Sequence, residues 1–265
     1  MIFYKNKYGC SISEIWYNRN IIPSKKTDIL FFKFVDKILD KAWFIENLFT
    51  LEINLSQSED TIFSFIRKNT KYEIKRALTK DNIKCETFLF FDKKDLNKVN
   101  QYLDFYNKFA DSKNRSHLSF SDVEQFYNTD TLCIRQATTE DNSEILCMHA
   151  YLLADGRSRL LQSSSHFRDF DNPDFRNLNA RANRLLHWDD IQYFKNLGIS
   201  CYDFGGWYGG TELKEQILIN QFKESFGGIK KQEYSYIIPV TIKGYFYILI
   251  RFFLKKTLNL FHKHV

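Results

Sequence analysis

The sequence predicts an α/β protein of the α+β type, with a mixed, mainly antiparallel sheet flanked by helices on both sides. Short apolar segments alternate with segments in which apolar residues recur at helical spacing. Near the centre, consecutive strand segments are joined by Asp155-Gly156, a dipeptide typical of an antiparallel hairpin. With 3 Pro and 10 Gly in 265 residues there is little material for a flexible linker, so we expect continuous compact structure.

The predicted strands are short apolar runs bounded by turns or charges. In the second of them, Leu51, Ile53 and Leu55 alternate with polar residues, which indicates one buried face. The predicted strands are residues 29–34, 48–55, 87–91, 131–137, 144–153, 159–165, 200–204 and 232–240.

The predicted helices begin at recognisable caps. Ser58 begins a short helix, and Thr70 with Glu73 and Ser121 with Glu124 have the spacing of capping boxes. A polar stretch, residues 166–179, comes before another helix. Helices are therefore expected to begin near residues 58, 70 and 121 and to cover residues 95–110, 180–197 and 213–226.

The charge is concentrated at the C-terminus. Lys and Arg number 38 against 32 Asp and Glu, and no acidic residue follows Glu233. Five basic residues lie beyond it, so the remaining chain has 33 basic against 32 acidic residues. A nucleic-acid-coating protein would carry a broader basic surface. We expect three parts: an N-terminal segment (1–55) packed on the core, a main domain (56–240) and a basic, aromatic C-terminal segment (241–265).

The cysteines and the N-terminus indicate a reducing, cytoplasmic location. The five cysteines are scattered without a Cys-x-x-Cys pair, so neither a disulfide framework nor a metal site is predicted. The first residues contain no apolar core of a signal peptide. The segment after residue 243 is apolar, aromatic and basic, but charges interrupt any run long enough to span a bilayer. It is predicted to be an interfacial helix on the inner face of an anionic membrane, or a core helix closing the domain.

Two stretches resemble a known family. Tyr202-Asp-Phe-Gly-Gly206, followed by residues 219–228 with their Phe222-Lys223 pair, is similar to the C-terminal signature of the FemAB-like branch of the GNAT acyltransferase superfamily. Residues 66–77 are similar to the basic helix pair of the family's second GNAT unit. The resemblance covers roughly residues 56–240. It implies a GNAT-like fold and transfer of an acyl group to an amine.

The resemblance leaves the acyl donor open between an acyl thioester and aminoacyl-tRNA. A GNAT loop that cradles the coenzyme A pyrophosphate contains glycine, whereas residues 176–184, expected to form that loop, contain none. The long helical arm of the tRNA-dependent members is also missing at this length. No permanently bound cofactor is expected, and the donor is predicted to contact Arg181, Asn183 and Arg184.

Two residues are candidates for catalysis. In the tRNA-dependent members that the Phe-Lys pair resembles, the lysine corresponding to Lys223 stabilises negative charge on the acyl carbonyl. The alternative is a lysine on a helix surface. Asp203, at the end of an apolar strand, could act as a general base or orient the acceptor amine, or it could cap the Gly205-Gly206 turn.

Substrate contacts are expected around the glycine-rich loop and at nearby strand ends. The loop at residues 205–210 offers backbone groups and two aromatic faces for a sugar or an acyl chain. His149 lies on a strand that borders the acyl site in GNAT folds, and its alternative is a hydrogen-bonded sheet residue. His187 is expected to be packed. His166 and Arg168 follow the strand end at residues 163–165, a place where ligands commonly bind. The predicted substrate contacts here are His149, Ser163, Ser165, His166, Arg168, Gly205, Gly206, Trp207, Tyr208 and Phe222.

A basic helix face precedes the main domain's first strands. Basic residues recur there at multiples of four, which places them on one side of a helix. Such a face is either solvated or binds the phosphate of a nucleotide-linked or lipid-linked acceptor. For phosphate binding we single out Arg67 and Arg76.

The sequence predicts an acyltransferase that moves an acyl or aminoacyl group onto an amine of a cell-envelope glycan or polysaccharide precursor. The alternatives are a peptidoglycan bridge peptidyltransferase that uses aminoacyl-tRNA, and a non-catalytic scaffold docked on a membrane. The expected partners are the glycan, nucleotide-sugar or lipid-linked acceptor, an anionic membrane surface and charged tRNA.

Overall fold

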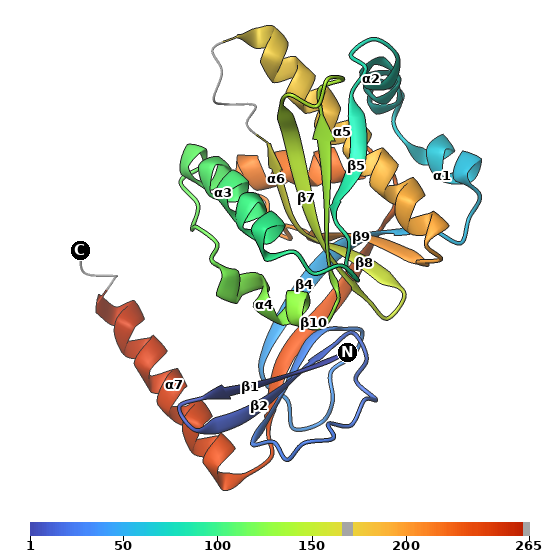
Figure 1. The fold of residues 1–265 in the computed structure, drawn as a ribbon. Helices are drawn as coiled ribbons and strands as arrows, with labels where there is room; N and C mark the ends of the chain where they lie inside the picture. The colour runs from blue at the N-terminus through green and yellow to red at the C-terminus, as the bar shows by residue number, and fades with distance from the viewer. Residues whose placement is uncertain (166–171, 262–265) are drawn as a thin grey trace. The chain divides into compact units, whose positions relative to one another are not determined.

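The computed structural model describes residues 1–165 and 172–261, and their side chains as far as Arg251 (Figure 1). The predicted site residues His166 and Arg168 therefore lie outside the described residues. The chain forms two compact units: residues 1–49 with 232–265, and residues 50–231. The limits of these units fall inside two strands, β4 (Trp43–Asn54) and β10 (Ile229–Pro239). The three-part division expected from the sequence stays a prediction.

The first unit contains strands in the order β1-β2-β3-β10. Strand β1 (Ile2–Lys7) runs antiparallel to β2 (Cys10–Trp16), which is parallel to β3 (Ile29–Val35), and β3 is antiparallel to β10. The sequence did not predict β1 and β2. Strand β2 buries Ser13 and Glu14 on the sheet, so its apolar pattern is interrupted. The Glu14 carboxylate is compensated by the ammonium groups of Lys5 and Lys33 at 2.8 and 3.1 Å.

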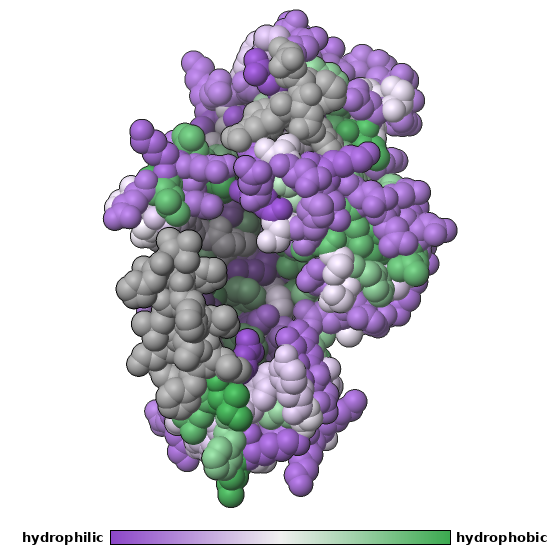
Figure 2. Space-filling model, turned by 90° about the vertical axis from the view of Figure 1, so that its left-hand side faces the viewer, coloured by the Kyte–Doolittle hydropathy of each residue, from purple (hydrophilic) through white to green (hydrophobic). Residues whose placement is uncertain are grey.

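The C-terminal segment forms helix α7 (Ile242–Phe261), which lies partly in the core of the first unit. Ile248 is 2% exposed and packs with Cys10 and Ile29, as the core-helix alternative predicts. Phe246 and Ile250, in contrast, are 62% and 58% exposed. Figure 2 shows apolar surface gathered over the start of this helix. Among the helices of the described residues, none is both long and apolar enough to cross a bilayer.

The second unit has the mixed, mainly antiparallel sheet predicted from the sequence. Its strands follow the order β4-β9-β8-β7-β6-β5. Strands β8 and β9 pair in parallel and the other neighbours are antiparallel. The predicted hairpin at Asp155-Gly156 joins β7 to β8, and both turn residues have positive φ (51° and 72°), as a type I′ turn requires. The strands are β5 (Lys84–Leu89), β6 (Leu132–Thr138), β7 (Ile145–Ala154), β8 (Arg157–Ser165) and β9 (Cys201–Gly206).

Helices cover both sides of this sheet. Helix α5 packs along β5 to β8 on one side, and α3 packs on β5, β7 and β8 on the other (Figure 1). The helices of the second unit are α1 (Glu59–Phe65), α2 (Lys68–Thr79), α3 (Leu96–Ser112), α4 (Phe120–Asn128), α5 (Pro173–Asn196) and α6 (Lys214–Glu224).

Both predicted capping boxes are wrong in position. Helix α2 begins at Lys68, so Thr70 lies inside its first turn and is buried instead of capping it. Helix α4 has a capping box, but Ser119 and Asp122 form it, two residues before the predicted pair. Ser58 caps α1 as predicted, since its side chain accepts from the Thr61 N–H at 3.2 Å.

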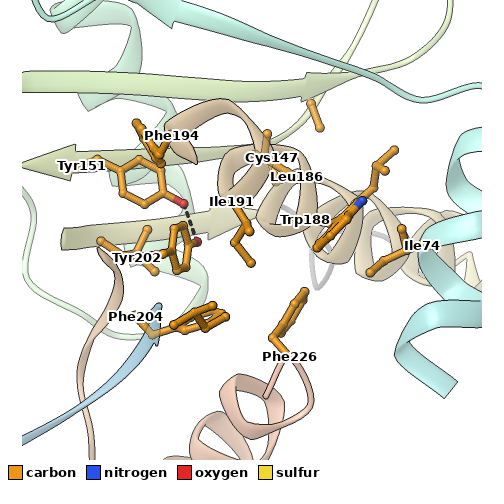
Figure 3. Close-up of a cluster of buried hydrophobic side chains, with 14 of the residues drawn as sticks. Ile74, Cys147, Tyr151, Leu186, Trp188, Ile191, Phe194, Tyr202, Phe204 and Phe226 are labelled. Carbon is orange, nitrogen blue, oxygen red and sulfur yellow. Dashed lines mark hydrogen bonds between the residues drawn. The ribbon is translucent and has the colours of Figure 1, made fainter. Parts of the chain in front are cut away.

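An aromatic core lies between the sheet and α5 in the second unit. Figure 3 shows Tyr151, Phe194, Tyr202, Phe204 and Phe226 gathered in it. Two of these rings carry hydroxyl groups that face each other at 2.7 Å inside the apolar cluster. A buried hydroxyl pair is costly unless it belongs to a completed hydrogen-bond network, so this feature leads directly to the site.

Candidate active site

A cavity of about 520 Å³ opens in the second unit, and several predicted site residues line it. Its walls come from α3, α5, α6 and the ends of β8 and β9. The polar side chains that line it include Lys223 and His187, while Phe204, Phe222 and Leu218 provide apolar surface. Of the predicted residues, the cavity brings together Ser163, Ser165, Asn183, Gly206, Phe222 and Lys223.

Lys223 is a buried lysine on the cavity wall. Its side chain is 9% exposed and its Nζ donates to the Gly206 carbonyl oxygen at 2.5 Å. Burial lowers the pKa of Lys223 to about 8, while the charge of Asp203 opposes that shift and Arg159 adds to it. An ammonium group has three N–H bonds, so two can point to a ligand while one holds the Gly206 carbonyl.

Asp203 is fully buried and fixes the glycine turn beside the cavity. Its Oδ1 accepts from the Thr50 hydroxyl and from the Gly205 N–H, the latter at 2.8 Å. Its Oδ2 accepts from the guanidinium groups of Arg157 and Arg159 at 3.0 and 2.7 Å. These four donors use the lone pairs of both carboxylate oxygens. The contacts support the turn-capping alternative, and Asp203 is not among the described residues that line the cavity.

Gly205 requires its glycine. Its φ is +68°, and a Cβ at this position would lie 2.6 Å from the Leu160 carbonyl oxygen on the neighbouring strand. The turn therefore places β9 close to β8 and directs the next carbonyl, that of Gly206, to Lys223. This links the predicted Gly-Gly signature to the position of the lysine.

The remainder of the glycine-rich loop is held against α6. The Tyr208 backbone N–H donates to Asn220 Oδ1 at 3.1 Å, and Asn220 Nδ2 donates back to the Tyr208 carbonyl at 2.8 Å. Trp207 packs on the apolar core, with the Lys230 ammonium 5.8 Å from its ring centroid. Neither aromatic residue lines the cavity in the described part of the chain, and their role in substrate binding stays a prediction.

The predicted donor loop is wrong, because residues 176–184 are helical. Helix α5 begins at Pro173 after the Asn172 cap, so the backbone N–H groups of this stretch lie in helical turns and are not open to a pyrophosphate. Arg181 forms a bidentate pair with Asp81 across to the end of α2, at 2.5 and 3.1 Å. Asn183, in contrast, lines the cavity.

A second, smaller cavity of about 310 Å³ shares Phe222 and Leu218 with the first. Arg67 and Arg184 line it. Arg67 pairs with Glu224 at 3.1 Å, and burial lowers the pKa of Arg184. Arg76 is exposed on α2 and is not among the residues that line either cavity in the described chain.

His149 belongs to a buried polar network behind the cavity. It is 0% exposed, its Nδ1 lies 2.7 Å from Asp190 Oδ2, and its Nε2 lies 2.7 Å from Asn183 Oδ1. The Ser163 hydroxyl donates to the same Asn183 oxygen at 3.3 Å. His149 therefore acts on the cavity through Asn183, as a hydrogen-bonded sheet residue.

The ligand atoms of His149, His187 and Asp190 lie within 4.8 Å of one another, as metal ligands could. However, Asp190 already accepts from Arg135 Nε at 2.9 Å and from the Tyr151 hydroxyl at 2.6 Å. A carboxylate neutralised by a guanidinium is a poor cation ligand. The cluster fits a hydrogen-bond network better than a metal, and the absence of a metal stays a prediction.

His187 is one of the cavity residues that the sequence did not indicate. It is packed as expected, with the rings of Phe204, Phe222 and Phe226 5.1–5.5 Å away, but it also lines the cavity. Burial holds its pKa well below the usual value, and the charges of His149, Lys223 and Arg184 lower it further. A histidine in the middle of an apolar helix face gives no signal of this in the sequence.

Solved structures share the fold of this chain. FemX matches with a TM-score of 0.62 over 89% of this chain and 84% of its own, at 10% identity. The C-terminal DUF2156 domain of a putative lysylphosphatidylglycerol synthetase from Agrobacterium fabrum matches with a TM-score of 0.56 over 94% and 83%, at 10% identity. A conserved protein of unknown function from Bacteroides thetaiotaomicron matches at 0.53 over 90% and 82%, at 8% identity.

No protein-family model and no curated protein sequence matches this chain. The likeness to the solved structures therefore shows the fold, and at this identity it shows the fold alone. The chain shares the GNAT-like fold of these structures, which is the fold that the resemblance of Tyr202-Asp-Phe-Gly-Gly206 implied.

Proposed function

We propose that this protein is an acyltransferase that moves an acyl or aminoacyl group onto an amine of a cell-envelope glycan or polysaccharide precursor. The observation that carries the proposal is the buried ammonium of Lys223 on the wall of a 520 Å³ cavity, held by the Gly206 carbonyl. Amide formation passes through a tetrahedral intermediate with negative charge on the former carbonyl oxygen. A cation held in a fixed position beside the reacting carbonyl stabilises that charge better than water does, because it need not reorient during the reaction.

The names of the fold neighbours support an aminoacyl donor. The putative lysylphosphatidylglycerol synthetase is named for a product that joins an amino acid to a lipid. Burial of the Lys223 ammonium is costly, and its place on the wall of a cavity favours a role in catalysis over a scaffold without activity. The tRNA-dependent peptidyltransferase remains the second candidate, since the helical stretch 176–184 offers no pyrophosphate cradle to a coenzyme A thioester.

The test of the proposal separates the two donors and the scaffold. Calorimetry with acetyl-CoA and with aminoacyl-tRNA is expected to show no micromolar binding of acetyl-CoA, because residues 176–184 form helical turns and do not form a glycine loop that could hold its pyrophosphate. Each donor is then incubated with an amino-sugar nucleotide or a lysine-containing peptide, and mass spectrometry detects the amide. An amide product confirms acyl transfer. The donor that yields it shows whether the enzyme uses an acyl thioester or aminoacyl-tRNA. Micromolar binding of acetyl-CoA would contradict our interpretation that helix α5 does not bind the pyrophosphate. If no donor and acceptor pair gives an amide, acyl transfer is refuted and the non-catalytic scaffold is favoured.

We also propose that the first half of α7 binds an anionic membrane surface. Phe246 and Ile250 are exposed on this helix, and five basic residues but no acidic residue follow Glu233. The double variant Phe246→Ser, Ile250→Ser is expected to lose most of its co-sedimentation with phosphatidylglycerol-containing vesicles. The control Ile22→Ser replaces an 85% exposed isoleucine elsewhere in the same unit and should bind like the wild type. Equal binding by all three proteins, or equal binding to uncharged vesicles, would contradict the proposal.

A further inference from the structure

A chain of hydrogen bonds connects His187 at the cavity to a buried ion pair. The chain starts at Asp190, whose Oδ1 accepts from Arg135 Nε at 2.9 Å. The Tyr151 hydroxyl lies 2.6 Å from Asp190 Oδ2, the Tyr202 hydroxyl lies 2.7 Å from that of Tyr151 (Figure 3), and His187 Nδ1 lies 2.7 Å from the Tyr202 hydroxyl. All these side chains are less than 4% exposed.

The direction of each hydrogen bond follows from counting hydrogens. A carboxylate paired with a guanidinium only accepts, so the Tyr151 hydroxyl donates its single hydrogen to Asp190. The Tyr202 hydroxyl must then donate to Tyr151. Burial raises the pKa of both tyrosines, so both hydroxyls keep their hydrogens. The oxygen of Tyr202 can therefore only accept from His187, which fixes the hydrogen of the imidazole on Nδ1.

This assignment leaves Nε2 of His187 without a hydrogen. Within the described residues Nε2 makes no hydrogen bond, and with Nδ1 turned to Tyr202 it is the polar atom that His187 can present to the cavity. The rings of Phe204, Phe222 and Phe226 lie 5.1–5.5 Å from the imidazole, and His187 is 1% exposed. A neutral imidazole with a bare nitrogen in an active-site cavity is the arrangement of a general base.

We infer that His187 is the general base that takes the proton of the attacking amine, and that Asp190, Tyr151 and Tyr202 are positioning residues that hold it in the Nδ1–H form. This inference rests on the proposed acyl transfer and adds a second catalytic residue to Lys223. Both residues line the same cavity. Within one tetrahedral intermediate, His187 can therefore accept the amine proton while Lys223 stabilises the oxyanion.

The reaction then balances without an outside reagent. The amine nitrogen bonds to the acyl carbon, the carbonyl π electrons move to oxygen beside Lys223, and an amine proton moves to His187 Nε2. When the oxyanion re-forms the C=O bond, the bond to the ester oxygen or thioester sulfur breaks. The leaving group takes the proton from Nε2 and departs as an alcohol or thiol, and His187 is neutral again.

Chemical rescue tests the base directly. His187→Ala is expected to lower single-turnover transfer by about 10²–10⁴, and exogenous imidazole should restore part of it by entering the space that the side chain leaves. A purely structural histidine would show no such rescue. Tyr202→Phe keeps the ring in the core but removes the acceptor of Nδ1–H, so we expect a loss of turnover, because the group that fixes the tautomer of a catalytic histidine contributes to the rate. The control Tyr236→Phe changes a buried tyrosine of the first unit and should have no effect.

A spectroscopic measurement tests the inference even if no acyl donor is found. In ¹⁵N-histidine-labelled protein at pH 7, the His187 signals, assigned by their loss in His187→Ala, should show a protonated Nδ1 and a bare Nε2. In Tyr202→Phe the population of that tautomer should fall. An imidazolium or an Nε2–H tautomer in the wild type would overturn the inference. The expected tautomer together with no amide product would instead refute the proposed function.

Discussion

Lys223→Met is expected to lower turnover by about 10²–10³, the usual cost of losing one oxyanion donor. Methionine keeps most of the apolar stem that packs on the cavity wall and removes only the charge. Lys223 is 9% exposed and its ammonium contacts the Gly206 carbonyl, so the substitution removes a charge from a buried position on the cavity wall. Single-turnover transfer and acceptor binding, measured on the same preparation, separate lost chemistry from lost affinity.

The control for this variant is Lys214→Met. Lys214 lies on the same helix, α6, but its side chain is exposed, so turnover should equal that of the wild type. Undiminished turnover in Lys223→Met would remove the lysine from the mechanism and leave His187 as the candidate. A Lys223→Met protein that fails to fold would show that the residue is needed for structure.

Asp203→Asn is expected to have the largest effect on stability, lowering the free energy of unfolding by about 3 kcal/mol. The substitution keeps the shape of the side chain but leaves the guanidinium groups of Arg157 and Arg159 beside a neutral amide. Arg159 is 4% exposed, so its guanidinium loses the charge of Asp203 in a place that water hardly reaches. Arg157 retains a second partner, Glu52 Oε1 at 2.6 Å. We therefore expect the loss of free energy of unfolding to lie near the lower end of the range for broken buried ion pairs.

Urea denaturation monitored by circular dichroism measures this loss, and Glu224→Gln is its matched control. Glu224 pairs with Arg67 at 3.1 Å, but both side chains are about half exposed, so removing that charge should cost less than about 1 kcal/mol. Equal losses in the two variants would contradict the buried-clamp role of Asp203. A folded Asp203→Asn protein that lacks activity at full acceptor occupancy would favour the catalytic role considered from the sequence.

The sequence predicted the sheet of the second unit well because its strands carry their own signals. The hairpin at Asp155-Gly156 and the period-2 pattern ending at Leu55 are local features, which can be recognised within a short window of the sequence. Strand β2 was not predicted because it buries the charged residue Glu14, whose partners Lys5 and Lys33 come from neighbouring strands. No window of the sequence shows that compensation.

Only the part of the site that lies in a local sequence motif was predicted. Lys223 and Gly206 lie in a recognisable signature, and the structure places both at the cavity. The donor loop was placed wrongly because the polar stretch before residue 180 concealed a helix that begins with Asn172 and Pro173. His187 was missed because its role depends on Asp190, Tyr151 and Tyr202, which three separate elements bring to one line of hydrogen bonds.

The pH dependence of Lys223→Arg tests most directly the central claim that a charged Lys223 stabilises the transition state. With a pKa of about 8, Lys223 is charged below pH 8 and loses its charge as the pH rises through that value. Arginine stays charged over the whole range. The ratio of wild-type to Lys223→Arg single-turnover rates cancels the titration of the acceptor amine, which is common to both. We predict that this ratio is constant below pH 7 and falls between pH 7 and 9, and a ratio that stays flat or rises would contradict the claim.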